Sequence, residues 1–296
     1  MLKNLKISTK VFAGFGTILA LLAVLSLVGG VSLGSAGGYF TEYREAARQR
    51  NALNRVNIAL QRVRVNVRNF IIAPKDQVAR QTIDRLGQLD RETGEALKVM
   101  ASRPDLVSQV RIVDAKGKEL STLFSDVVKR QADADKAVKD VIDVAGFQAD
   151  HELTGLIKTG QRENLIDEMY YGGMALRHLL LARLEARTFL ARGDEESFGQ
   201  AKKNLAELDG FLQKLAKAME DDRRKARVVK IAESSKTFAR GLDDLHTAVQ
   251  TRNDIFEVRM TALGNDMVKT GDDLTGTLRD FQDALGPKAE SAINTA

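Results

Sequence analysis

The sequence predicts an all-α protein in which an N-terminal transmembrane helix is followed by six helices forming two stacked four-helix bundles. Three observations carry this prediction. They are a long uncharged segment near the N-terminus, three-four spacing of apolar residues through the rest of the chain, and an internal repeat. Ala, Leu, Lys, Arg, Glu and Asp dominate the 296 residues and Pro occurs only 3 times, which favours long helices over sheets.

Composition also excludes several classes of function. The chain has no Cys, so disulfides, thiol catalysis and Cys-based metal sites are excluded. The net charge of +5 is spread along the chain without a basic block, which disfavours nucleic-acid binding. No G-x-S-x-G, P-loop or H-E-x-x-H pattern occurs. We therefore expect no enzyme activity, no cofactor and no metal site.

The N-terminal segment has the properties of a membrane span. Residues 11–41 contain no charged residue, and the apolar part, 11–33, exceeds the roughly 20 residues that a helix needs to cross hydrocarbon. Lys3, Lys6 and Lys10 precede it, so we expect residues 1–10 to stay in the cytoplasm. A cleaved signal peptide is the alternative, with a shorter apolar region. The anchor predicts that everything after residue 40 lies outside the cytoplasm.

Apolar residues at three-four spacing predict helices after residue 40, and chain breakers predict where these helices end. The stripe of the first helix is Leu53, Val56, Leu60, Val63, Val67 and Phe70. Breaks are expected at Pro74, at Ser102–Asp105, at Gly155 and Gly160, at Gly193, at Asp221–Asp222 and at Gly286–Pro287. The expected helices are about 40–73, 75–102, 105–156, 161–191, 195–219 and 222–285.

An internal repeat organises these helices. Arg64, Arg68 and Phe70 return 119 positions later as Arg183, Arg187 and Phe189, and Pro74 corresponds to Gly193. The simplest packing runs the two long helices one way and the two broken pairs the other way. The helical domain would then cover 40–285, followed by residues 286–296. We expect a membrane-proximal bundle of about 40–73, 131–191 and 249–285, and a distal bundle of about 75–130 and 194–248.

Arginines fall at one height of the expected proximal bundle. Arg64 and Arg68 flank the stripe of the first helix, and Arg183 and Arg187 do so on the fourth. Arg252 and Arg259 occupy two positions of the sixth helix that the apolar spacing reserves for buried side chains, with Thr251 adjacent. A buried guanidinium needs a counter-charge, and Arg grips carboxylates through two donors. The alternative is that these arginines extend into water or pair with Asp133, Asp135 and Asp140.

The residues that carry a family resemblance are the opening I-S-T-K-V-F-A-G-F-G-T-I-L-A-L-L and the duplicated R-x-x-x-R-x-F segments. The opening resembles the first transmembrane helix of methyl-accepting chemotaxis proteins, and the part after it resembles the helical bimodular sensor domain. That resemblance implies six helices in two stacked bundles, a small organic acid as ligand, and a homodimer. Arg64 and Arg183 match the arginine positions of that family, whereas the register of the sixth helix is ambiguous by several residues.

The resemblance implies the ligand-sensing part of a bacterial chemoreceptor in the inner membrane, with signalling by helix displacement. Its ligands would be C4 dicarboxylates or other TCA-cycle intermediates. Two alternatives stay open, namely the input module of a sensor histidine kinase and a module that recognises a periplasmic binding protein. The sequence stops at Ala296 without a second membrane helix, a HAMP module or a methylated hairpin. We therefore expect a truncated receptor, in which cytoplasmic signalling partners would need the missing part.

Overall fold

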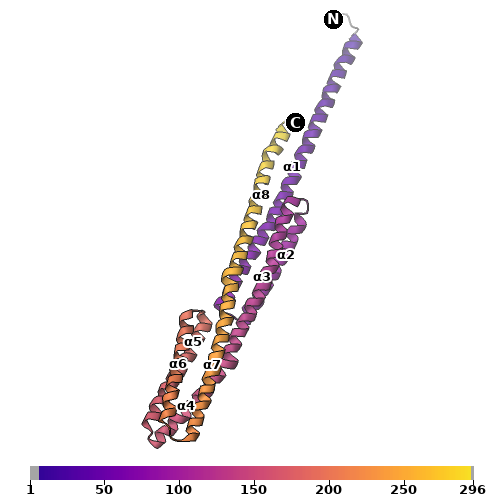
Figure 1. Cartoon of the computed structure of the whole chain (residues 1–296). Coiled ribbons are helices and arrows are strands. Elements are labelled where there is room, and N and C mark those ends of the chain that lie inside the picture. The colour runs from indigo at the N-terminus through magenta and orange to yellow at the C-terminus, as the bar shows by residue number, and fades with distance from the viewer. Residues whose placement is uncertain (1–6, 295–296) are drawn as a thin grey trace. The chain divides into compact units, whose positions relative to one another are not determined.

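The computed structural model describes residues 7–294, which contain helices and no strand, so the all-α prediction is confirmed. The helices form six continuous rods, because α3, η1 and α4 follow one another without a break, as do α7, η2 and α8 (Figure 1). The elements are α1 (Ile7–Ile72), α2 (Asp76–Val99), α3 (Pro104–Lys136), η1 (Ala137–Ile142), α4 (Asp143–Glu163), α5 (Ile166–Arg192), α6 (Glu195–Ala218), α7 (Asp222–Asp254), η2 (Ile255–Met260) and α8 (Thr261–Asn294).

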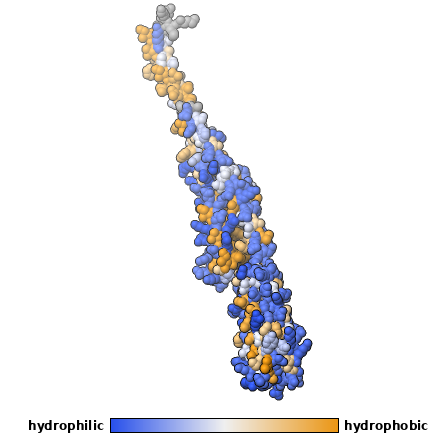
Figure 2. Space-filling view, turned by 90° about the vertical axis from the view of Figure 1, so that its left-hand side faces the viewer, coloured by the Kyte–Doolittle hydropathy of each residue, from blue (hydrophilic) through white to orange (hydrophobic). Residues whose placement is uncertain are grey.

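The predicted membrane span and the first helix of the bundle are one helix, α1. Its N-terminal part is long and apolar enough to cross a membrane, with a mean hydropathy of 2.5 over 18 residues. Figure 2 shows hydrophobic surface along this part of α1. Lys3 and Lys6, on which the predicted orientation depends, lie outside the described residues.

The internal repeat is visible in the helix boundaries. Helix α6 begins and ends 119 positions after α2 (195 against 76, and 218 against 99). The π-helix η2 begins and ends 118 positions after η1 (255 against 137, and 260 against 142). The offset falls by one because residues 100–103 join α2 to α3, whereas only residues 219–221 join α6 to α7. The order α1, α2, α3, η1, α4 is therefore repeated as α5, α6, α7, η2, α8.

Buried positions follow the same repeat. Every residue that α5 buries has a buried counterpart in α1, 119 positions earlier. The counterparts are Gln49 and Glu168, Leu53 and Gly172, Val56 and Ala175, Leu60 and Leu179, Val63 and Ala182, Val67 and Ala186, and Phe70 and Phe189. Equivalent helices thus turn the same face inward, as expected of a duplicated helical unit.

The chain divides into two compact units, and unit 1 contains Met1–Glu119 and Gly264–Ala296. Its described part is a bundle of α1, α2, the start of α3, and α8. Side-chain contacts tie each helix to the next, since Arg55 pairs with Glu92 at 3.0 Å and Thr93 donates to Asp114 at 2.9 Å. The ion pair of Lys116 with Asp266 joins α3 to α8.

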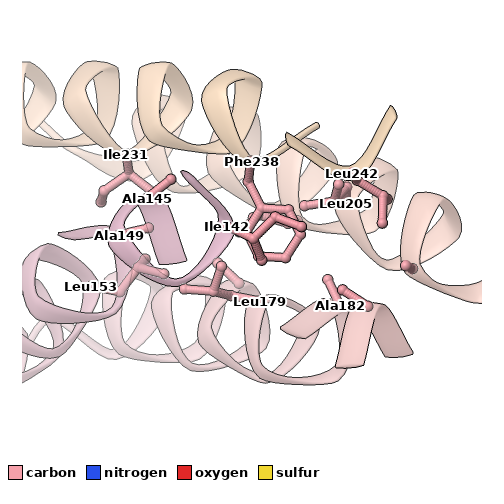
Figure 3. Packing of buried hydrophobic residues seen from close by; sticks show 14 of the residues in the cluster. Ile142, Ala145, Ala149, Leu153, Leu179, Ala182, Leu205, Ile231, Phe238 and Leu242 are labelled. Atoms are coloured by element: carbon pink, nitrogen blue, oxygen red, sulfur yellow. The ribbon is translucent and has the colours of Figure 1, made fainter. Parts of the chain in front are cut away.

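Unit 2 contains Leu120–Leu263 and is built around antiparallel neighbours α4, α5, α6 and α7. Its core alternates large and small side chains, as Figure 3 shows for Ile142, Phe238 and Leu179 beside Ala145 and Ala149. A close approach occurs where Gly241 of α7 meets η1. A β-carbon there would lie 2.8 Å from Cγ1 of Val141.

These units differ in their boundaries from the two predicted bundles, because the chain reverses at both predicted breaks. Helix α1 ends at Ile72 and α2 returns alongside it, while α5 ends at Gly193, whose φ of 69° permits the turn into α6. The sequence analysis instead expects each broken pair to continue in one direction. As a result the predicted proximal bundle draws residues from both units, and so does the predicted distal one.

Two expected breaks lie inside helices. Gly155 and Gly160 belong to α4, where they accommodate Arg227 and Met169, and the turn falls at Asn164 with a φ of 56°. Helix α8 passes through Pro287 to Asn294. A proline removes one hydrogen bond from a helix interior, and the Ala, Lys and Glu that follow it favour helix strongly enough to continue the helix.

Candidate functional site

In unit 1, Arg64 extends from α1 to α8. Its Nη2 donates to Oδ1 of Asn265 at 3.0 Å. The side chain crosses Gly264, where a β-carbon would lie 3.8 Å from Cδ of Arg64. Asn265 is a neutral partner, and among the described residues no carboxylate oxygen lies within 4.0 Å of the Arg64 guanidinium. Arg64 is exposed, so water solvates its charge, and no carboxylate of the described residues pairs with it.

Arg68 lies one turn further along α1 and is exposed. Within residues 7–294 its guanidinium also has no carboxylate within 4.0 Å. Two like charges four residues apart on one helix repel each other by a few tenths of a kcal/mol. Anion binding by Arg64 and Arg68 stays a prediction.

In unit 2, the equivalent arginines of α5 have carboxylate partners on α4. Arg183 lies 3.8 Å from Asp150, and Arg187 donates to both carboxylate oxygens of Asp143 at 3.1 and 2.9 Å. Arg183 crosses Gly146 as Arg64 crosses Gly264, but more closely. A β-carbon on Gly146 would lie 2.9 Å from Cδ of Arg183. In unit 2 the arginines thus form structural ion pairs, the alternative that the sequence analysis left open. Their partners are Asp150 and Asp143 and not the aspartates that the sequence analysis named.

Arg252 is buried in unit 2, with 5% of its surface exposed, as its place in the apolar spacing predicts. It donates from Nη1 to Oε1 of Gln131 and from Nε and Nη2 to Oδ1 of Asn253 at 3.1 and 2.9 Å. Burial lowers the pKa of Arg252 below its ordinary value, while the charges of Asp135 and Glu257 oppose that shift. Amide oxygens thus satisfy a guanidinium that the sequence analysis assigns to an anion.

Thr251 and Arg259, unlike Arg252, are not buried. The hydroxyl of Thr251 donates to the backbone oxygen of Thr247 at 2.7 Å, within its own helix. Arg259 is exposed and Met260 is buried instead, so the expectation that Arg259 occupies a buried position is wrong. The reason is η2, because a π-helical turn adds one residue and rotates the following positions around the helix axis.

The seven predicted residues belong to both units, with Arg64 and Arg68 in unit 1 and Arg183, Arg187, Thr251, Arg252 and Arg259 in unit 2. Their convergence on a single ligand stays a prediction. The sequence does not predict the residues that face the arginines, because contacts between helices far apart in sequence depend on packing. The repeat does continue through α4 and α8 at an offset of 118, which aligns Gly146 with Gly264.

Comparisons with known proteins bear on the first half of the chain. The family model described as Tar ligand binding domain homologue matches residues 1–137, which include Arg64 and Arg68. No curated protein matches the chain. Proteins of this family are in general not enzymes, and the apolar part of α1 is consistent with an inner-membrane protein. The match supports a chemoreceptor-type ligand-binding domain that binds a small ligand.

Proposed function

We propose that the chain is the sensing part of a bacterial transmembrane chemoreceptor of the helical bimodular type, and that unit 1 binds a small organic acid. The ligand class is a C4 dicarboxylate or another TCA-cycle intermediate. The observation that carries the proposal is the pair Arg64 and Arg68, whose charge no carboxylate of the described residues compensates, in the region that matches the family model.

The chemistry of this pair suits a carboxylate. Guanidinium groups bind carboxylates through two parallel hydrogen bonds, and a ligand with two carboxylates could engage both arginines. The amide NH2 group of Asn265 can donate a hydrogen bond to the ligand when Arg64 turns from Asn265 to the ligand. Of the four arginines related by the repeat, Arg64 and Arg68 are the two without a carboxylate partner among the described residues.

Signal transmission would follow from the helices that the site joins. Arg64 lies on the helix that carries the membrane span, and Asn265 lies on α8, the last helix of the chain. A bound acid would draw these two helices together and favour one axial position of α8 over another. In this proposal the ligand-binding domain lies in the periplasm and the receptor is a homodimer.

The test is acid binding by the full chain in lipid nanodiscs, measured by calorimetry with succinate, malate and citrate. Arg64→Gln should weaken binding by about 10- to 100-fold, since a hydrogen bond to a charged group contributes about 1.5–3 kcal/mol. Arg183→Gln is the matched control, because it removes the equivalent arginine of unit 2, and it should leave the affinity unchanged. Equal losses in both variants would favour the single convergent site expected from sequence.

A second candidate function is recognition of a periplasmic binding protein. It rests on apolar side chains that unit 2 exposes on α4 and α5, above all Phe147, which is 66% exposed, and Leu184, which is 59% exposed. Large exposed apolar patches can mark protein contacts. A photo-crosslinker at position 147 would then capture one defined protein, and none of the acids would bind the chain.

A further inference from the structure

Unit 2 contains a second version of the proposed acid site at equivalent positions. In both units an arginine of the first helix crosses a glycine that lies four residues after a π-helix. The two glycines, Gly146 and Gly264, are 118 positions apart, as are η1 and η2. Buried positions of α4 and α8 also coincide at this offset, since Ala149, Leu153 and Leu156 correspond to Met267, Gly271 and Leu274. The two sites therefore have the same scaffold.

The residues that face the arginines differ in charge. At the offset of 118, Asp143 of unit 2 corresponds to Thr261 of unit 1, and Asp150 corresponds to Val268. Asp143 binds Arg187 through both oxygens, and Asp150 pairs with Arg183. A third difference replaces Asn265 with Phe147, which has no hydrogen-bonding group. Unit 2 thus supplies from its own chain the two carboxylates that a dicarboxylic acid would bring.

We infer that Asp143 and Asp150 are built-in ligands that close the unit 2 site to free organic acids. A tethered carboxylate is present at an effective concentration in the millimolar range or above, so a free acid at lower concentration does not displace it. Removing the aspartates would open the site, because Arg183 and Arg187 would regain uncompensated charge on an unchanged scaffold. This inference rests on the proposed function only for the open site of unit 1 that serves as its reference.

The experiment measures succinate binding by the full chain in nanodiscs, with unit 1 silenced by Arg64→Gln and Arg68→Gln. We expect this background to bind no succinate at millimolar concentration. Adding Asp143→Thr and Asp150→Val, the residues of unit 1, should produce binding at least tenfold tighter than the background. Adding Arg183→Gln and Arg187→Gln to that variant should abolish it again. Asp143→Asn with Asp150→Asn is a second opening variant, closer in shape to the native side chains.

The result that would overturn the inference is a folded opening variant, with native helicity by circular dichroism, that binds succinate no better than the background. Succinate binding by the background itself, lost on Arg183→Gln, would also overturn it, because the native site would then be open. Failure of the proposed function looks different. In that case the native chain binds no acid and Arg64→Gln changes nothing, while the gain on removing Asp143 and Asp150 can still appear.

Discussion

Unit 1 and unit 2 place an arginine pair on the same face of equivalent helices, but the facing helix differs. In unit 1, Arg64 meets the neutral Asn265, whereas in unit 2 the aspartates of α4 pair with Arg183 and Arg187. The backbone around the two sites is alike, with a π-helix and a glycine at matching positions. The comparison teaches that the scaffold sets where an arginine lies, and that the residues of the facing helix set whether it meets a neutral or a charged partner.

The largest expected effect tests whether the two units are equally well packed. Leu60 of α1 and Leu179 of α5 are equivalent, and each has 0% of its surface exposed. Replacing either with Ala should lower the free energy of unfolding by about 2–5 kcal/mol, because methyl groups are lost and a cavity remains. Chemical denaturation of the full chain measures both losses. A loss below about 1 kcal/mol at either position would show that its unit is loosely packed there.

The next effect is a pH dependence of stability that Glu168 of unit 2 causes. Burial raises the pKa of Glu168 above its ordinary value, and its ion pair with Arg224 opposes this only in part. Folding therefore disfavours the charged form of Glu168. Its contribution to the free energy of unfolding is fully present at a pH below the ordinary pKa of Glu, and it is lost as the pH rises through the raised pKa of the folded state. Its counterpart in unit 1 is Gln49, which does not titrate.

Glu168→Gln should remove this pH dependence. The melting temperature of the variant, relative to that of the native chain, should increase between pH 4 and pH 7. Gln49→Glu is the reciprocal variant and should introduce the same dependence into unit 1. A difference in melting temperature that stays constant across this pH range would contradict the assignment.

A smaller effect compares the two glycines beneath the arginines. Gly264→Ala should stabilise the chain by up to about 1 kcal/mol, since Ala favours helix and its β-carbon would make an ordinary contact with Arg64 at 3.8 Å. Gly146→Ala should gain less than half as much, because its β-carbon would lie 2.9 Å from Cδ of Arg183 and displace that side chain. Thermal unfolding of both variants measures this. Equal gains would mean that the closer contact in unit 2 costs nothing to relax.

The smallest expected effect concerns the ion pair of Arg187 with Asp143. Its side chains are 60% and 28% exposed, so a double-mutant cycle should give a coupling of only about 0.2–1 kcal/mol. Arg68→Ala, at the equivalent position of unit 1, should change stability by less than the experimental error. A coupling above about 2 kcal/mol would show that the pair fixes the packing of α4 against α5.

The sequence predicted the helices better than their directions. Three-four spacing located the buried stripe of α1, and the 119-residue repeat aligned α2 with α6 residue for residue. The breaks at Pro74 and Gly193 were also found. Whether the chain continues or reverses at a break depends on which apolar faces meet across it, and spacing along a single helix carries no information about that.

The sequence predicts the arginines of the candidate site but not the residues that face them. Residue type identified the arginines, and apolar spacing identified Arg252 as buried. The position of Arg259 was wrong because one extra residue in η2 changes the register, and the sequence has no proline or glycine there to mark it. The facing residues Asn265, Asp143 and Asp150 were not found, since contacts between helices far apart in sequence depend on how the rods pack.

The sequence by itself determined that this protein is helical, duplicated and equipped with one apolar segment long enough to cross a membrane. Those properties follow from local periodicity and composition, which each stretch of chain carries alone. Only the tertiary structure decided that α1 folds back on α2 and α5 on α6, and which side chains the arginines meet. Packing determines which face of each helix is buried and which residues face the arginines. Arg64 meets a neutral residue and Arg183 meets a carboxylate, and this difference distinguishes the two units.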